Sequence, residues 1–298
     1  MTAPTHRTSV VPLDDKPIQG LKADNPFTKQ SQAEQADRFF STAEERAAVA
    51  PQLQQMREEG YAVLPHAIPA GRAEEIAGEI RRLNEDTPWG RGAFDGYKTR
   101  RVFNMLAKTR VLDELALHPQ VVALAEGYLE DQIQFSQALG ITIYPGQEAQ
   151  ALHRDDDYFP LPRPRPPMIM NALWAITDFT AETGATHIVP RTHLTADAEP
   201  PPGEVLRAEM PAGSVVVYDG AMFHGGGANQ STAPRIGLTM LYSRAWLRQQ
   251  ENHYLSVPRD VVREMPRRLQ QLLGYWVYNN LLGVVEGRSP MRVLEHNA

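Results

Sequence analysis

The chain has 298 residues, of which 42% are hydrophobic and 22% are charged, and it contains no cysteine. This length and composition predict one globular domain with enough apolar material for a sizeable core. The missing cysteines exclude disulfide scaffolds, zinc fingers, iron–sulfur clusters, thiolate-ligated haem and thiol nucleophiles. Any metal ion must therefore be held by His, Asp or Glu.

The charge and the apolar pattern favour a protein that acts on small molecules. Thirty Lys and Arg against 36 Asp and Glu give a net charge of −6, which argues against general affinity for nucleic acid or anionic membranes. No apolar stretch approaches the ~20 residues of a membrane helix, and the N-terminus lacks the apolar core of a secretory signal. We expect a cytoplasmic protein with a small-molecule substrate, no nucleic-acid partner and no membrane span.

The first part of the chain is predicted to be an irregular arm followed by helices. Residues 1–30 mix Pro, Thr, Asp and Lys without a period, which predicts an irregular arm. Residues 31–298 are expected to form a single domain, whose first part, 31–130, is helical. Helices are predicted over 31–59, 68–84 and 111–129, the last one broken at Pro119.

Short β-branched and aromatic runs separated by Gly, Pro and Asp fill residues 131–245. Their connections are too short and too Pro-rich for a parallel α/β fold. We therefore predict a mainly β protein with flanking α-helices and a double-stranded β-helix core, the cupin-like jelly roll, with an open mouth for a ligand. The expected strands are 133–135, 139–144, 169–177, 186–189, 205–209, 214–218 and 236–243.

The last part, 246–298, is predicted to be a helical segment, since a helical pattern returns past Pro258. The apolar stretch 275–285 within it is either core or the contact of a homodimer, and the sequence does not separate these two.

Two histidines and an aspartate form the best candidate for a metal site. His153 and Asp155 are two residues apart in a segment expected to be extended, so their side chains project from the same face. His224 opens a returning strand and precedes three glycines, which allow a close approach to the backbone. Two His and one carboxylate leave three facial positions open, which suits non-haem Fe(II) that also holds a co-substrate and oxygen.

A single arginine adds a second element. Arg235 opens the strand after His224, and the period of two places it on one face with Gly237 and Thr239. A guanidinium on an inward face needs an anion, and a carboxylate is its best partner. Taken singly, each element has a simpler interpretation: a solvated acidic turn at 155–157, a turn histidine at 224, and a strand-end arginine facing solvent at 235.

In order and spacing these elements resemble the phytanoyl-CoA dioxygenase family of Fe(II)- and 2-oxoglutarate-dependent dioxygenases. The resemblance runs from about Gly60 to Pro258. One departure is Arg191-Thr192-His193, where many relatives have Gly-Ser-His. The motifs that carry it are 144–146 leading into 150–155, then 178–186, 189–193, 219–229 and 246–252.

The resemblance implies a role for each site residue. His153, Asp155 and His224 would bind the iron. Arg235 would pair with the distal carboxylate of 2-oxoglutarate, and Gln137 and Thr186 would also contact this co-substrate.

The resemblance also implies the reagents Fe(II), 2-oxoglutarate and O2, and a hydroxylation, desaturation or related C–H oxidation of a small organic molecule. Related halogenases have a small residue at the position of Asp155, so the carboxylate favours these oxidations. The sequence does not identify the substrate. Two other functions fit the same motifs: a non-redox cupin-like binding protein or isomerase, and a relative with an inactive site.

Two loops are expected to contact the substrate. The Gly-rich loop 89–101 carries aromatic and basic residues, and the Pro-rich stretch 159–167 follows the ligand pair and is better interpreted as a stiff rim than as a polyproline partner motif. His187 and His193 are expected to be packing or surface residues. The predicted substrate contacts are Phe94, Tyr97, Arg101, Tyr158 and Phe159.

Overall fold

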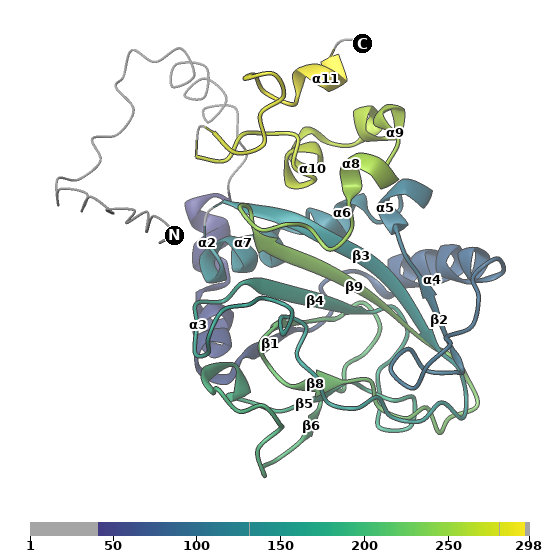
Figure 1. Ribbon diagram of the computed structural model, residues 1–298. Coiled ribbons are helices and arrows are strands. Elements are labelled where there is room, and N and C mark those ends of the chain that lie inside the picture. Colours follow the sequence, from purple (N-terminus) through teal and green to yellow (C-terminus); the bar gives the residue numbers. More distant parts are fainter. Residues whose placement is uncertain (1–40, 131, 280, 296–298) are drawn as a thin grey trace, which may run out of the picture.

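Two antiparallel sheets lie at the centre of the molecule (Figure 1). The computed structural model describes residues 41–130, 132–279 and 281–295. The arm predicted over 1–30, and the start of the helix predicted over 31–59, lie outside these residues. The large sheet has the order β1 (Tyr61–Leu64), β7 (Val215–Asp219), β4 (Ile169–Ala175), β9 (Arg235–Arg244), β3 (Ile133–Ile143) and β2 (Thr99–Val102), and the small sheet has the order β6 (Leu206–Arg207), β5 (His187–Ile188) and β8 (His224–Gly225).

Helices flank the sheets, and they cover one face of the large sheet (Figure 1). The N-terminal helices confirm the predicted pattern in outline, with Pro119 at the first turn of its helix, where its missing N–H costs nothing. The helices are α2 (Ala43–Ala48), α3 (Ala50–Glu59), α4 (Ala70–Asn84), α5 (Met105–Lys108), α6 (Asp113–Ala116), α7 (Pro119–Tyr128), the 3-10 turn η1 (Thr192–Leu194), α8 (His253–Ser256), α9 (Arg259–Glu264), α10 (Arg267–Leu272) and α11 (Arg292–Glu295).

One face of the large sheet packs in the core, and the other face lines a cavity. Along β9, Ile236, Leu238 and Met240 are buried in the core beneath the helices. Arg235 and Thr239 point the other way and line a cavity between the two sheets. The period of two therefore holds, and the jelly-roll prediction is confirmed: one face of the sheet builds the core and the other builds a site.

Several predicted bounds are wrong. The strands expected at 133–135 and 139–144 are one strand, β3, with a bulge in which Phe135 pairs with Tyr242 and Gln137 pairs with Leu241. The extra residue, Ser136, accepts a backbone hydrogen bond from Gln250 on its hydroxyl. The short strands β1 and β2 interrupt the part predicted to be helical, since each gains its stability from pairing along β7 and β3.

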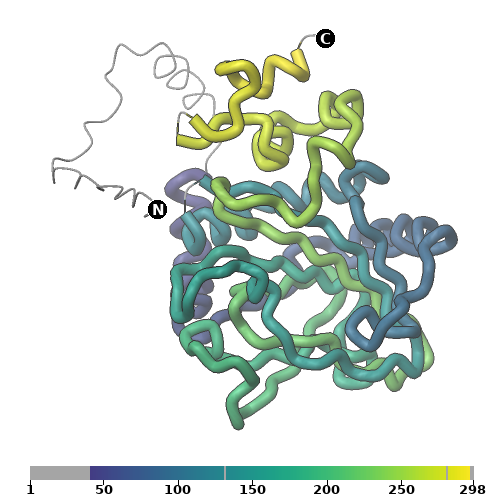
Figure 2. Tube along the Cα trace, viewed as in Figure 1, coloured from purple at the N-terminus to yellow at the C-terminus, as the bar shows by residue number. Residues whose placement is uncertain are grey.

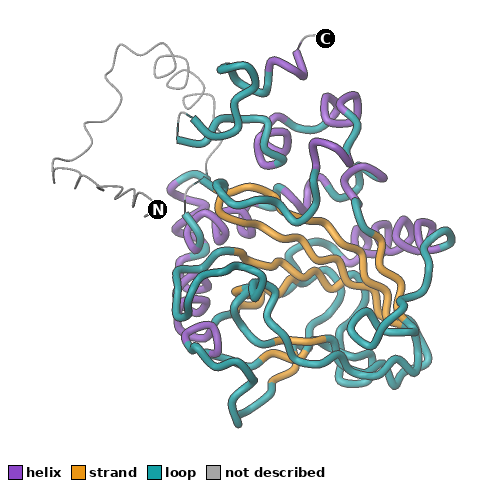
Figure 3. The backbone as a smooth tube through the Cα atoms, in the orientation of Figure 1, coloured by secondary structure: helices purple, strands orange, loops and turns teal. Residues whose placement is uncertain are grey.

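The C-terminal segment is less helical than its pattern suggests. Its helices are short because Pro258 and Pro266 restart the chain at α9 and α10, and loop dominates between α10 and α11 (Figure 3). In the stretch 275–285, Tyr275 and Val277 are buried while Leu281 and Leu282 are exposed. This segment, yellow in Figure 2, lies away from the small sheet. Among the described residues, no helix combines the length and the apolar character needed to cross a membrane.

Candidate metal centre

His153, Asp155 and His224 meet at one end of the cavity. Their ligand atoms all lie within 4.8 Å of one another. Oδ1 of Asp155 is 3.4 Å from Nε2 of His153, and Oδ2 is 3.3 Å from Nε2 of His224. The backbones of the two histidines are paired directly by two hydrogen bonds of 2.9 Å. The sequence pattern therefore predicts a cluster that the fold does assemble.

Backbone carbonyls orient both imidazoles toward the carboxylate. Nδ1 of His153 lies 3.0 Å from the carbonyl oxygen of Ala151, and Nδ1 of His224 lies 3.0 Å from that of Met222. A ring nitrogen that faces a carbonyl carries the hydrogen, so each neutral ring presents the lone pair of Nε2 to Asp155. Three lone-pair donors that converge in this way are the donor set of a metal ion.

The charges at the cluster fit a bound cation. Burial by itself would raise the pKa of the Asp155 carboxyl, but the facing imidazoles of His224 and His153 hold that pKa below its usual range. Burial would likewise lower the pKa of His224, and the Asp155 carboxylate raises it above its ordinary value instead. The cluster thus favours a positive charge between its members, and a set of two nitrogens and one oxygen suits a divalent transition-metal ion.

A cavity of about 260 Å³ opens beside the cluster. Its wall combines residues from both sheets and from the loops that join them. The apolar lining residues are Phe94, Phe103, Leu139, Ile141, Ile143, Leu173 and Leu241, and the polar ones outside the cluster are Asp95, Arg101, Gln137, Gln150, Thr186, Tyr218, Thr239, Arg235 and Gln250.

Arg235 is a buried cation in this wall. Its side chain donates from Nη1 to the carbonyl oxygen of Gly184 at 2.5 Å, and its guanidinium lies 4.1 Å from the centroid of the Phe179 ring. Among the described residues no carboxylate pairs with it, and its Nε has no hydrogen-bond partner. Burial, together with the nearby Arg101, lowers the pKa of Arg235 to about 9. A buried guanidinium of this kind fits an anionic ligand.

The predicted co-substrate and substrate contacts divide into two groups. Gln137, Thr186, Phe94 and Arg101 line the cavity, and the Phe94 ring stands 4.8 Å from the His153 ring in an edge-on arrangement.

Tyr158, Phe159 and Tyr97 lie outside the cavity wall. Tyr158 reaches the cavity indirectly, because its hydroxyl accepts a hydrogen bond of 2.6 Å from Gln250, which is a lining residue. Phe159 packs on Tyr158 with ring centroids 4.5 Å apart. Tyr97 is 65% exposed on the surface of its loop.

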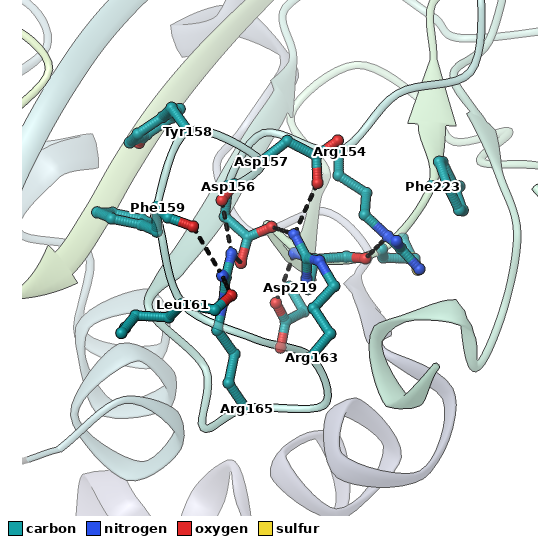
Figure 4. A network of polar contacts seen from close by, with 12 residues as sticks. Arg154, Asp156, Asp157, Tyr158, Phe159, Leu161, Arg163, Arg165, Asp219 and Phe223 are labelled. Atoms are coloured by element: carbon teal, nitrogen blue, oxygen red, sulfur yellow. Dashed lines mark hydrogen bonds and ion pairs between the residues drawn. The ribbon is translucent and has the colours of Figure 1, made fainter. Parts of the chain in front are cut away.

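The rim that follows the ligand pair folds around Asp156. This buried carboxylate is held between Arg163 and Arg165 (Figure 4). Arg165 also donates to the carbonyl oxygens of Phe159 and Leu161. Ion pairs and hydrogen bonds therefore brace the Pro-rich stretch, but its residues do not line the cavity, so its role as the rim of the site stays a prediction.

Two site residues escape the sequence pattern. Asn171, in the middle of β4, is fully buried and donates from Nδ2 to Oδ2 of Asp155 at 2.8 Å. Tyr218, on β7, packs its ring 4.6 Å from the ring of His224. A polar amide within an otherwise apolar strand was the available signal for Asn171, because an amide in a core needs a partner.

Neither His187 nor His193 belongs to the cluster: His187 is half-buried in β5, and His193 is buried in the turn η1 that follows Arg191. Nε2 of His193 lies 3.2 Å from the carbonyl oxygen of Arg57, well away from the cluster. Arg191 has φ +66°, in the left-handed region that favours glycine. Its guanidinium forms an ion pair with Glu59.

Comparison with known proteins identifies the group to which this architecture belongs. The phytanoyl-CoA dioxygenase family model matches residues 56–237, more than half of the chain. The chain belongs to the phytanoyl-CoA dioxygenase family. Similar members include the dioxygenase olcK of Penicillium canescens, 29% identical over 77% of this chain and 81% of olcK. Another is the dioxygenase FrzG of a Cladobotryum species, 34% identical over 60% of this chain and 65% of FrzG.

Solved structures agree. The chain is similar to the non-haem, α-ketoglutarate-dependent epimerase SnoN from nogalamycin biosynthesis, with a TM-score of 0.58, 26% identity, and coverage of 67% of this chain and 82% of SnoN. HygX from Streptomyces hygroscopicus, at 18% identity and a TM-score of 0.55, shares the fold over 67% of this chain and 89% of its own. As a member of this family the protein is an Fe(II)- and 2-oxoglutarate-dependent dioxygenase.

Proposed function

We propose that His153, Asp155 and His224 hold the Fe(II) and that Arg235 binds the distal carboxylate of 2-oxoglutarate. One observation carries this assignment: a cluster of two imidazoles and a carboxylate shares a single cavity with a buried guanidinium that has no acidic partner among the described residues. Gln137 and Thr186 line the same wall and complete the contacts to the co-substrate.

A second cation extends the assignment. 2-Oxoglutarate carries two carboxylates, and the cavity holds two guanidinium groups, Arg235 and Arg101. Burial lowers the pKa of Arg101, while the charges of Asp95 and Asp155 act on it in the opposite direction. Arg101 also lies 3.8 Å from a carboxylate oxygen of Asp95, so in this proposal its charge is shared between Asp95 and the dianion, and Arg235 is the main cation for 2-oxoglutarate.

The iron, when bound with 2-oxoglutarate and O2, supplies the oxidation of an unactivated C–H bond, while the co-substrate is converted to succinate and CO2. The protein supplies placement. The carbonyls behind the two imidazoles keep Nε2 available as the ligand atom, and Arg235 fixes the far end of the co-substrate. The apolar wall excludes water and holds the substrate against the open side of the cluster.

The substrate in this proposal is a small organic molecule of secondary-metabolite or lipid-like character. Phe94 and Phe103 are both cavity-lining and at least half exposed, so they offer an apolar entrance. Two neighbours with solved complexes also handle such molecules, since SnoN was crystallised with nogalamycin RO and HygX with hygromycin B. The family name is no evidence for phytanoyl-CoA. The cytoplasm as location and a homodimer through the exposed residues near Leu281 belong to the proposal as well.

Release of succinate tests the function directly. With Fe(II), ascorbate and O2 present, the wild-type protein is expected to convert 2-oxoglutarate to succinate, slowly without substrate and faster with it. His224→Ala and Asp155→Ala are expected to abolish the conversion. A non-redox binding protein or isomerase of the same fold forms no succinate, so a wild-type rate equal to that of the variants contradicts the proposal.

A further inference from the structure

Arg154 lies between His153 and Asp155 in the sequence, and its side chain extends away from the cluster. Its side chain is buried, and Nε donates to the carbonyl oxygen of Ala221 at 2.7 Å. Nη2 donates to the carbonyl oxygen of Thr192 at 2.9 Å and to Oγ1 of Thr195 at 3.2 Å. Nη1 donates to the carbonyl oxygen of Asp197. Within the described residues this guanidinium forms no ion pair with a carboxylate, so its hydrogen bonds go to oxygens that are formally neutral.

The segment that Arg154 reaches leads into His224. The guanidinium lies 4.0 Å from the centroid of the Phe223 ring (Figure 4). Thr192, which accepts from Arg154, in turn accepts a hydrogen bond on Oγ1 from the backbone N–H of Phe223 at 2.9 Å. Arg154 therefore holds both ends of the three residues that precede the histidine.

The backbone pairing explains why a side chain is needed here. His153 pairs with His224, and the N–H of Asp155 donates to the carbonyl oxygen of Gly220 at 2.8 Å. Between these two points a single residue, Arg154, faces the three residues 221–223. On the longer side, residues 221–223, the N–H of Met222 donates to the carbonyl oxygen of Asp219, and the carbonyl oxygen of Phe223 accepts from the N–H of Val189. Among the described residues the carbonyl oxygen of Ala221 has no backbone partner, and Nε of Arg154 supplies the donor for it.

Met222, the middle residue of 221–223, sets the orientation of the cluster residue His224. The carbonyl oxygen of Met222 is the group that lies 3.0 Å from Nδ1 of His224 and orients its imidazole. A shift of 221–223 would therefore rotate the ring that faces Asp155. Partners behind metal-ligating histidines typically change metal affinity by about ten- to hundred-fold when they are lost.

We infer that Arg154 is a positioning residue of the metal site: it joins the His153–Asp155 half to the His224 half by clamping residues 221–223. This inference rests on the proposed metal-binding role of the cluster. Arg154, the middle residue of the His-x-Asp pattern, would then support the metal site without being one of its ligands.

The experiment measures Co(II) affinity of the full chain by calorimetry and visible absorption. Arg154→Met keeps much of the length of the side chain and removes its hydrogen bonds. The matched control is Arg165→Met, because Arg165 is also buried in this loop and also donates to backbone carbonyls, yet it contacts residues 156–161 instead of 221–223. Far-UV circular dichroism and thermal unfolding of the metal-free proteins report folding separately.

We expect the Co(II) dissociation constant of Arg154→Met to rise about ten- to hundred-fold and that of Arg165→Met to stay within about two-fold of wild type. Folded Arg154→Met with wild-type affinity overturns the inference, and so does an equal loss in Arg165→Met. If Arg154→Met does not fold, Arg154→Lys decides: it cannot reach both segments at once and should bind more weakly than wild type, whereas wild-type affinity overturns the clamp. Failure of the wild-type protein to bind Co(II) would instead contradict the proposed function.

Discussion

The side-chain amide of Asn171 donates a hydrogen bond of 2.8 Å to Oδ2 of Asp155, the same oxygen that faces His224. The other oxygen of the carboxylate faces His153. Asn171 is fully buried in β4 and cannot move without disturbing the sheet. It therefore fixes which oxygen of Asp155 is presented to which histidine.

Replacing Asn171 tests this arrangement. Asn171→Ala is expected to weaken Fe(II) or Co(II) binding by about ten-fold, because the carboxylate loses the partner that holds its plane. Asn84→Ala is the matched control: Asn84 is also buried and donates to Thr142 at 2.8 Å, away from the cluster. Metal titration of both variants gives the comparison, and equal affinities for the two would contradict the role of Asn171.

Arg235 should govern the co-substrate without governing the metal. A charge-assisted pair contributes ~1.5–3 kcal/mol, so Arg235→Met is expected to raise the dissociation constant of 2-oxoglutarate roughly 10- to 150-fold. Arg244→Met, at the other end of β9, removes an arginine paired with Glu130 and should leave that constant unchanged. Isothermal titration with Co(II)-loaded protein measures it. Unchanged 2-oxoglutarate affinity in Arg235→Met would remove Arg235 from the site.

Gly237 provides the space in which Arg235 lies. A Cβ at this position would approach Cζ of Phe179 to 3.0 Å and Nη2 of Arg235 to 3.4 Å. Gly237→Ala is therefore expected to displace the guanidinium and to raise the KM for 2-oxoglutarate by less than Arg235→Met does. A Cβ at Gly140, on the neighbouring strand, meets only ordinary contacts from 3.5 Å outward. A KM in Gly237→Ala as low as that of Gly140→Ala would speak against this arrangement.

His253 makes the stability depend on pH. Burial, with its ring 6.0 Å from that of Phe135, lowers the pKa of His253 to about 4. The unfolded chain takes up this proton below its ordinary pKa of about 6.5, so between these values the unfolded state binds more protons and stability falls as the pH falls. At pH 5 the titration of His253 lowers the free energy of unfolding by about 2 kcal/mol relative to neutral pH. This effect is absent in His253→Leu.

Urea unfolding at pH 7 and pH 5 measures this effect. The wild-type protein is expected to lose more stability than His253→Leu between the two pH values, whatever the variant costs at pH 7. Equal losses in the two proteins would show that His253 titrates normally.

The sequence predicts the cluster because its chemistry fixes residue type and spacing together. A His and an Asp two residues apart on an extended segment must face the same side. By the same alternation, Arg235 and Thr239 must lie on the same face of their strand. These rules depend only on neighbouring residues, so they hold in the folded protein. The places of Gln137 and Thr186 in the cavity wall are instead what the family resemblance implies.

The parts that the sequence does not predict depend on contacts between distant segments. Asn171 is 16 residues from Asp155, and Arg154 reaches Thr192, which is 38 residues away. The exposed Tyr97 and the cavity-lining Phe94 belong to one loop, and only the folded path of that loop separates them. The strand β1 escapes notice because four residues become a strand only by pairing with β7.

The central claim is that His153, Asp155 and His224 bind iron with 2-oxoglutarate. Anaerobic titration of the metal-free protein with Fe(II) and 2-oxoglutarate, followed by visible absorption, tests it most directly. The wild-type protein and His187→Ala, which alters a histidine outside the cluster, should give the weak charge-transfer band of the complex, and Asp155→Ala and His224→Ala should give none. A wild-type protein without the band, or an unchanged band in both cluster variants, would contradict the account.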